Sequence, residues 1–437
     1  RATLSNGLKV VLVERHEAPI VQLQLLFTGG AGADSQARSG TTAMTLDMLD
    51  EGTKTRSALQ ISARAESLGA TFAFGSNGDF AFVGLNALTA RLPESLELYA
   101  DILINPAFPE SELPRLKQQM ISGIRQRKTD PVGLATRLQP GLVYGADHPY
   151  AVFNRVTEDD VAGLTPASLS AFYKRWFRPD LATLLVVGDT NLAHVMPLLE
   201  QRFAAWKAPP EPAPTLTVAN VPRQTRPRVF LVNRSGAEQS TIVAAHVAQA
   251  RADPDFIALR ATNTVMGGSF LSRINMNLRE DKHWSYGAQT QLSEARGPGM
   301  FAVVAPVQTD KTAESLTEIR KELQEVTSTR KPDDNEIQVA KNTLVLTLPG
   351  NNETVAEISG SYRSILMFGL PDNYWNDFVG KVTALTPMSF SDAAAKLIDV
   401  NALTWIIVGD LEKIEAKVRA LNLGEVVVLD AEGNRLR

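Results

Sequence analysis

The sequence predicts an α+β fold of two homologous domains, each a mostly antiparallel sheet covered by helices, joined by a proline-rich linker. Three observations carry this prediction: an internal repeat of about 220 residues, short β-branched runs grouped with amphipathic stretches, and a proline cluster between the copies. The expected parts are an N-terminal domain at 1–207, a linker at 208–226 and a C-terminal domain at 227–437.

The repeat consists of three short segments that recur in the same order. Residues 9–15 (KVVLVER) return as 228–234 (RVFLVNR), 94–96 (ESL) as 314–316, and 182–189 (ATLLVVGD) as 403–410 (LTWIIVGD). Between the copies, APPEPAP at 208–214 has four prolines in seven residues, which neither a helix nor a central strand tolerates. This segment is therefore expected to be a stiff, extended linker.

The elements of the first copy follow from local pattern. Strands are expected at 8–13, 20–27, 71–74, 79–86 and 181–187, and helices at 92–104 and 110–128. The segment GSNG at 75–78 predicts a hairpin, because Asn-Gly suits a turn with positive φ. Pro93 and Pro109 stand near the expected helix starts, where the missing N–H costs nothing.

Composition excludes several classes of protein. The net charge of −4 without long charge runs argues against nucleic-acid binding. The absence of cysteine removes disulfides, thiolate nucleophiles and cysteine-bound zinc, and no apolar stretch approaches the roughly 18 residues of a membrane span. The chain begins with Arg1, which removal of a signal peptide or trimming would explain. The periplasm is the expected compartment, with the cytoplasm or an organelle as the alternatives.

Residues 38–53, RSGTTAMTLDMLDEGT, predict a helix that presents side chains at an active site. The residues presented are Ala43, Met44, Thr45, Leu46 and Asp47, of which the first four cannot ionise. The sequence thus retains the helix but not its chemistry.

This helix and the segments around it resemble the M16 family of zinc metallopeptidases, and the resemblance covers essentially the whole chain. The segments that carry it, in chain order, are LSNGLKV at 4–10, RSGT at 38–41, ML…GT at 48–53, DHPY at 147–150, LT at 164–165, FY at 172–173 and VVGD at 186–189. The family motif is an inverted His-x-x-Glu-His, in which two imidazoles bind zinc, the Glu activates the metal-bound water, and a later Glu completes the ligand set.

The chain departs from that motif at every position. Ala43 and Asp47 stand where the family has histidine, Leu46 stands at the Glu, and the distal Glu falls near Gly123. One carboxylate cannot replace three protein ligands. No catalytic residue and no metal ligand are therefore expected in this chain.

The resemblance implies a division of labour. An M16 working unit is two homologous halves closing on a peptide, of which one carries zinc. This chain is expected to be the whole zinc-less subunit of a heterodimer, inactive alone. Its partner would be a catalytic M16 chain with His-x-x-Glu-His and zinc, together forming a zinc metalloendopeptidase that takes peptide substrates.

Arg279 and Tyr286 match the family's substrate-binding segment on the zinc-less side, within LREDKHWSYG at 278–287. A guanidinium can hold a peptide carbonyl or carboxylate, and a phenol can donate to a carbonyl oxygen as charge develops. The alternative is that Arg279 forms a surface ion pair and Tyr286 packs in the core.

Strand addition at 70–74 is the expected mode of peptide binding, with an ordinary core hairpin as the alternative. Phe72 and Phe74 are expected in the core.

Gly267 and Gly268 are interpreted as a helix end or turn needing freedom in φ. His148, in the turn DHPY, is expected to be structural, and the five histidines form no local metal motif. The rival functions are a structural core-type subunit without peptide binding and an active enzyme with unrecognised chemistry.

Overall fold

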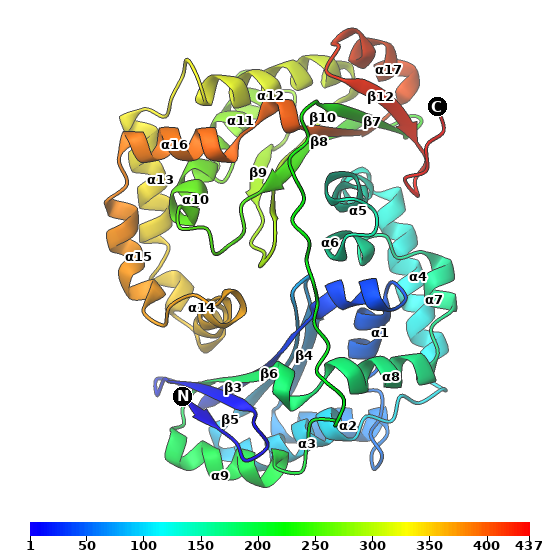
Figure 1. The fold of residues 1–437 in the computed structure, drawn as a ribbon, viewed down its shortest axis with the longest axis vertical. Coiled ribbons are helices and arrows are strands. Elements are labelled where there is room, and N and C mark those ends of the chain that lie inside the picture. The colour runs from blue at the N-terminus through cyan, green and yellow to red at the C-terminus, as the bar shows by residue number, and fades with distance from the viewer. The chain divides into compact units, whose positions relative to one another are not determined.

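The structure is a computed structural model that describes residues 1–437. It contains two six-stranded sheets with helices packed on them (Figure 1). This confirms the predicted α+β class with two mostly antiparallel sheets. Contacts divide the chain into two compact units, which are described separately below.

Unit 1 is built on the sheet β1-β2-β6-β3-β5-β4. Only β2 and β6 run parallel, and the other neighbours are antiparallel. Its strands are β1 Ala2–Thr3, β2 Lys9–Glu14, β3 Ile20–Thr28, β4 Thr71–Ser76, β5 Phe80–Leu88 and β6 Ala182–Gly188. All five strands expected in this half are present.

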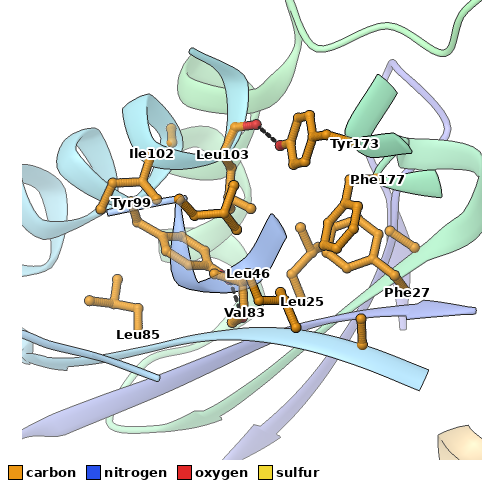
Figure 2. Packing of buried hydrophobic residues seen from close by; sticks show 14 of the residues in the cluster. Leu25, Phe27, Leu46, Val83, Leu85, Tyr99, Ile102, Leu103, Tyr173 and Phe177 are labelled. Carbon is orange, nitrogen blue, oxygen red and sulfur yellow. Dashed lines mark hydrogen bonds between the residues drawn. The ribbon is translucent and has the colours of Figure 1, made fainter. Parts of the chain in front are cut away.

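The helices of unit 1 form a main layer on one face of the sheet, except α14, which lies on the other face. They are α1 Thr41–Asp47, α2 Ala58–Leu68, α3 Leu92–Ile104, the first part of α4 Leu113–Thr129, α7 Glu158–Ala162, α8 Pro166–Trp176, α9 Leu192–Phe203 and α14 Val355–Phe368. Helix α4 begins at Leu113 rather than at 110, so Pro114 and not Pro109 occupies its first turn. Figure 2 shows the packing between sheet and helices, in which the Tyr99 hydroxyl donates to Val83 O and the Tyr173 hydroxyl to Leu103 O.

The hairpin between β4 and β5 is present, but its predicted mechanism is wrong. Gly78 does not adopt a positive φ. Instead the Asn77 side chain closes the turn, its Oδ1 accepting from the backbone N–H groups of Asp79 and Phe80 at 2.9 Å each. An asparagine side chain can mimic a backbone turn in this way without help from the glycine.

Unit 2 is built on the sheet β12-β7-β11-β8-β10-β9. Its strands are β7 Arg228–Asn233, β8 Gln239–Ala248, β9 Gln289–Leu292, β10 Gly299–Gln308, β11 Thr404–Gly409 and β12 Glu425–Leu429. Five of them repeat the order of β2, β6, β3, β5 and β4 in unit 1, including one parallel pair at the matching place. The internal repeat in the sequence therefore corresponds to a repeated sheet.

Unit 2 also carries helices on both faces of its sheet. They are α5 Pro131–Tyr144, α6 Pro149–Val152, α10 Phe256–Met266, α11 Arg273–Asn275 continued by the π-helical turn η4 Met276–Asp281, α12 Thr312–Val326, α13 Asp334–Leu346, α15 Tyr374–Thr383, α16 Pro387–Leu397 and α17 Leu411–Ala420. None of the helices in the chain combines the length and apolar character that crossing a bilayer requires.

The compact units differ from the contiguous halves expected at 1–207, 208–226 and 227–437. Residues 125–155 belong to unit 2, and residues 349–370 belong to unit 1. Helix α5 buries Leu134, Ala135 and Leu138 in the same cluster as β8 and β11, and α14 packs Val355 and Ile358 on Leu185. Each half of the chain thus covers an apolar face of the sheet that the other half builds, with α5 and α6 in unit 2 and α14 in unit 1.

Candidate functional site

Helix α1, where the family motif would stand, is firmly anchored. It begins after Gly40, whose φ of 86° is the left-handed conformation that glycine adopts without strain. Asp34 serves as a remote cap: its carboxylate accepts from Gly40 N at 2.7 Å, Thr42 N at 2.9 Å and Thr42 Oγ1 at 2.6 Å. Burial raises the pKa of Asp34 to about 6, although these hydrogen bonds favour the ionised form. The helix is therefore held in place without any metal ligand.

The motif positions on α1 divide between surface and core. Ala43 and Asp47 are exposed and share one face of the helix, as residues four apart do. Leu46 is only 2% exposed and belongs to the same core cluster as Leu25 and Val83 (Figure 2). The position that holds a catalytic carboxylate in the family is here a core position.

Gly123 lies in α4, and a Cβ built on it would meet no atom within 4 Å. A side chain would fit there, but glycine offers no donor atom. Asp47 is then the one ionisable group among the four motif positions, and no three His, Cys, Asp or Glu side chains anywhere in the chain are grouped to hold a metal ion. The residues present do not fit a zinc ion, which needs three protein ligands at a catalytic site.

Acidic side chains gather at the end of α1. Burial raises the pKa of Asp50 to about 6, and the charges of Glu51 and Asp47 add to that effect while Arg115 opposes it. Although Asp47 reaches solvent, the protein atoms around its carboxyl partly desolvate it and raise its pKa, with the charge of Glu51 contributing. Arg115 Nη2 and Glu51 Oε1 form an ion pair at 2.5 Å, which neutralises one of the three carboxylates.

The raised pKa of Asp50 makes stability fall as pH rises. The folded chain holds this proton up to about pH 6, whereas an exposed aspartic acid loses it near 3.8, so ionisation above pH 4 costs folding free energy. We expect Asp50→Asn to stabilise the protein by about 1 kcal/mol at pH 8 and by much less at pH 4.5. Urea unfolding at both pH values measures this. The control is Asp392→Asn on α16, and an equal shift at both pH values would contradict the assignment.

The second candidate site carries Arg279 in η4 and Tyr286 in the loop that follows. The Tyr286 side chain is 87% exposed, so the alternative in which it packs in the core is wrong. Arg279 Nε pairs with Glu280 Oε1 at 3.2 Å, which is the surface ion pair that the alternative interpretation predicts. The Arg279 guanidinium also lies 4.7 Å from the Phe270 ring centroid. The ion pair is exposed, and such pairs contribute little to stability.

Arg279 and Tyr286 line one cavity of about 270 Å³. The other residues around it are Gln239, Glu280, His283, Trp284, Ser285 and Gln308. His283 has a φ of 57°, uncommon for a residue with a side chain, and its Nδ1 lies 3.1 Å from Arg279 O. Gln308 donates to His283 O at 3.1 Å, so the loop is tied to β10. No sequence pattern indicated a site role for His283, which lines the cavity beside Arg279.

A neighbouring cavity of about 600 Å³ in unit 2 is lined by Gly267, Gly268 and Phe270 and by residues of β9. Gly267 ends α10 with a φ of −167°, so freedom in φ is not what requires glycine here. A Cβ at this position would lie 2.2 Å from Thr290 N. The close approach of the helix end to β9 is the physical reason for the glycine.

Strand β4 lies at the edge of its sheet and pairs only with β5. Phe72 and Phe74 are half-buried and pack on the core cluster, as expected, and the Phe72 ring stacks on the Tyr99 ring with 6.3 Å between the ring centroids.

His148 is structural as expected: it caps α6 through Nδ1, which accepts from Tyr150 N, and its Nε2 lies 3.0 Å from Ala219 O.

Comparison with known proteins agrees with this geometry. The family model described as Insulinase (Peptidase family M16) matches residues 9–137, and the one described as Peptidase M16 inactive domain matches residues 163–344. The chain belongs to peptidase family M16. Within the family it is an inactive member, consistent with the loss of the motif at Ala43, Leu46 and Asp47.

The relatives include proteins named zinc proteases and one named a non-peptidase homolog. The zinc protease PqqE of Helicobacter pylori is 24% identical over 320 residues, 72% of this chain and 71% of the relative. A protein of the same organism called non-peptidase homolog YmxG is 20% identical over 92% of both chains. The crystal structure of a peptidase M16 inactive domain from Pseudomonas fluorescens has a TM-score of 0.86 and 25% identity, covering 94% of this chain and 97% of that one.

Proposed function

We propose that this chain is the non-catalytic subunit of a heterodimeric M16 zinc peptidase, in which it binds peptide opposite the zinc site of a catalytic partner. The observation that carries the proposal is the combination of an anchored α1 without ligands and the exposed Tyr286 beside Arg279 at one cavity. The partner would carry the inverted His-x-x-Glu-His and the zinc, and this chain would need no cofactor of its own.

The chemistry of the Arg279 and Tyr286 pair suits a peptide. The guanidinium can donate to a peptide carbonyl or a terminal carboxylate with several N–H groups at once. The Tyr286 hydroxyl, in solvent, is available to donate to the scissile carbonyl as negative charge develops there. Backbone pairing of the peptide with the open edge of β4 would supply affinity with little sequence preference.

A structural core-type subunit of the same fold is the second candidate function. It accounts for the missing motif equally well, but it gives no reason to keep a tyrosine 87% exposed at the mouth of a cavity. An active enzyme with unrecognised chemistry is disfavoured by the side chains themselves, since Ala43 and Leu46 offer neither ligand nor base. The periplasm is the proposed compartment, which cell fractionation tests.

Tyr286→Phe tests the catalytic part of the proposal. In complex with a catalytic M16 chain, we expect turnover to fall about tenfold or more with little change in stability, as losing one oxyanion donor does. Arg279→Met tests the binding part of the proposal, and Arg419→Met is its matched control. Both arginines are exposed to a similar degree and pair with a neighbouring glutamate. Only the first should weaken peptide binding.

The isolated chain should bind no stoichiometric zinc and cleave no peptide. Unchanged turnover and affinity in Tyr286→Phe would remove that residue from the proposal. Chelator-sensitive cleavage by the purified chain alone would overturn the whole of it.

A further inference from the structure

Arg363 on α14 is a half-buried cation without an acidic partner. Its guanidinium makes one hydrogen bond, to Gln24 Oε1 at a long 3.5 Å, and lies 5.4 Å from the Phe82 ring centroid. Burial lowers the pKa of this guanidinium, and no carboxylate opposes the effect. A guanidinium has five N–H donors, so most of its hydrogen-bonding capacity is unused.

Two arginines of this chain that are almost fully buried, Arg178 and Arg273, are paired with a carboxylate. Arg178 donates to both oxygens of Asp180 at 2.7 and 2.8 Å, and Arg273 to both oxygens of Glu336 at 2.6 Å each. Because taking a cation out of water is costly unless an anion pairs with it, the unpaired state of Arg363 calls for an explanation. A ligand carboxylate would supply the missing partner.

The sheet face beneath Arg363 leads toward the edge strand. In register across β3, β5 and β4, Gln24 pairs with Gly84, and Gly84 with Ala73. Paired residues point to the same face of a sheet. This row therefore carries the polar side chain of Gln24 at its inner end, and from there to the edge it has only Gly84, without a side chain, and the methyl group of Ala73. The row of Gln24, Gly84 and Ala73 runs from the contact with Arg363 to the edge strand β4.

The two neighbouring rows of paired residues carry larger side chains. On one side the Phe82 ring lies over Gly75 of β4, where a Cβ would come within 2.6 Å of the ring. On the other side Gln22 faces Asn86, and the buried Gln22 Oε1 has no hydrogen-bond partner. Helix α14 covers this face at β6 and β3, where its Val355 and Ile358 pack on Leu185. The β5–β4 part keeps exposed Asn86 and Ala73.

We propose that Arg363 binds a carboxylate of a peptide paired with β4, so that this subunit prefers acidic peptides. The inference rests on the proposed function, and it adds a charge preference to a binding mode that backbone pairing alone would leave unselective. A strand added beyond β4 would lie about two strand spacings, roughly 10 Å, from β5. An extended glutamate side chain and the arginine side chain together can span this distance, over the small residues Gly84 and Ala73.

The test uses the full chain and nine-residue Thr/Val peptides with amidated C-termini. One series carries Glu at each position in turn, and a second carries Gln at the same positions. Fluorescence anisotropy should show at least one Glu peptide binding about tenfold tighter than its Gln counterpart, with the difference shrinking in high salt. Peptides with a free C-terminus and no Glu form a further arm, which distinguishes a terminal carboxylate from a side-chain carboxylate as the group bound.

Variants assign the preference to Arg363. Arg363→Gln should abolish the Glu preference while leaving the Gln peptides bound, and Arg363→Lys should keep most of it. Arg228→Gln is the matched control, since Arg228 is also partly buried, also lacks an acidic partner and lies 5.6 Å from the Phe230 ring centroid. Thermal melting of each variant separates loss of folding from loss of binding.

The outcomes separate the two proposals. Binding of all peptides without regard to charge, or a Glu preference that survives Arg363→Gln, overturns the role of Arg363 and leaves the proposed function standing. Failure of every peptide to bind overturns strand addition at β4 and the role of Arg363 with it, while the Tyr286→Phe experiment still tests the rest of the proposed function.

Discussion

Leu46→Glu, which places the family's catalytic carboxylate at its motif position, is expected to destabilise the protein by several kcal/mol at pH 8. Leu46 is 2% exposed among apolar side chains, and a carboxylate there would lose its hydration without gaining a partner. Burial would raise the pKa of the new group, so stability should be partly regained as pH falls toward 4 and the carboxyl is protonated. Urea unfolding at the two pH values measures both effects.

Two control substitutions isolate the buried charge in this experiment. Leu46→Met conserves volume and should cost less than about 1.5 kcal/mol. Ala43→His lies on the exposed face of α1 and should change stability by no more than about 0.5 kcal/mol. A Leu46→Glu protein as stable as the wild type at pH 8 would show that position 46 is not a core position, and the physical account of the lost motif would fail.

Arg273→Met is expected to cost about 3 kcal/mol and to loosen the Arg279 segment. Arg273 opens α11, which continues into η4, and its guanidinium pairs with both oxygens of Glu336 while also donating to Arg330 O and Lys331 O. Removing one partner of a buried ion pair leaves the other uncompensated. The midpoint of chemical unfolding should therefore fall, and peptide affinity should weaken because η4 carries Arg279.

A double-mutant cycle with Glu336→Gln separates the ion pair from the carbonyl contacts. We expect the double variant to be less destabilised than the sum of the two single variants, since each single change already breaks the same pair. Arg419→Met, which removes an exposed i,i+4 pair, serves as the surface control. A loss below about 1 kcal/mol for Arg273→Met would mean that this ion pair does not hold the segment.

Local pattern predicted the strands and helices of the first half well, because alternating and helical spacing of apolar residues depends on neighbours in sequence. The duplication was equally visible, and the sheets repeat each other's order. Two local details failed. The β4–β5 turn is closed by the Asn77 side chain rather than by a positive φ at Gly78, and Gly267 is required by its approach to Thr290.

The sequence by itself determined that the family's metal motif is missing, because ligands and bases are residue types, and Ala43, Leu46, Asp47 and Gly123 do not together supply three zinc ligands and a base. Through its resemblance to the family it also indicated Arg279 and Tyr286. Only the tertiary structure decided that these two line one cavity, that α5 and α14 each cover the sheet of the other half, and that Arg363 stands without an acidic partner. Those facts depend on which distant surfaces bury each other, and residues far apart in the chain carry no local record of that choice.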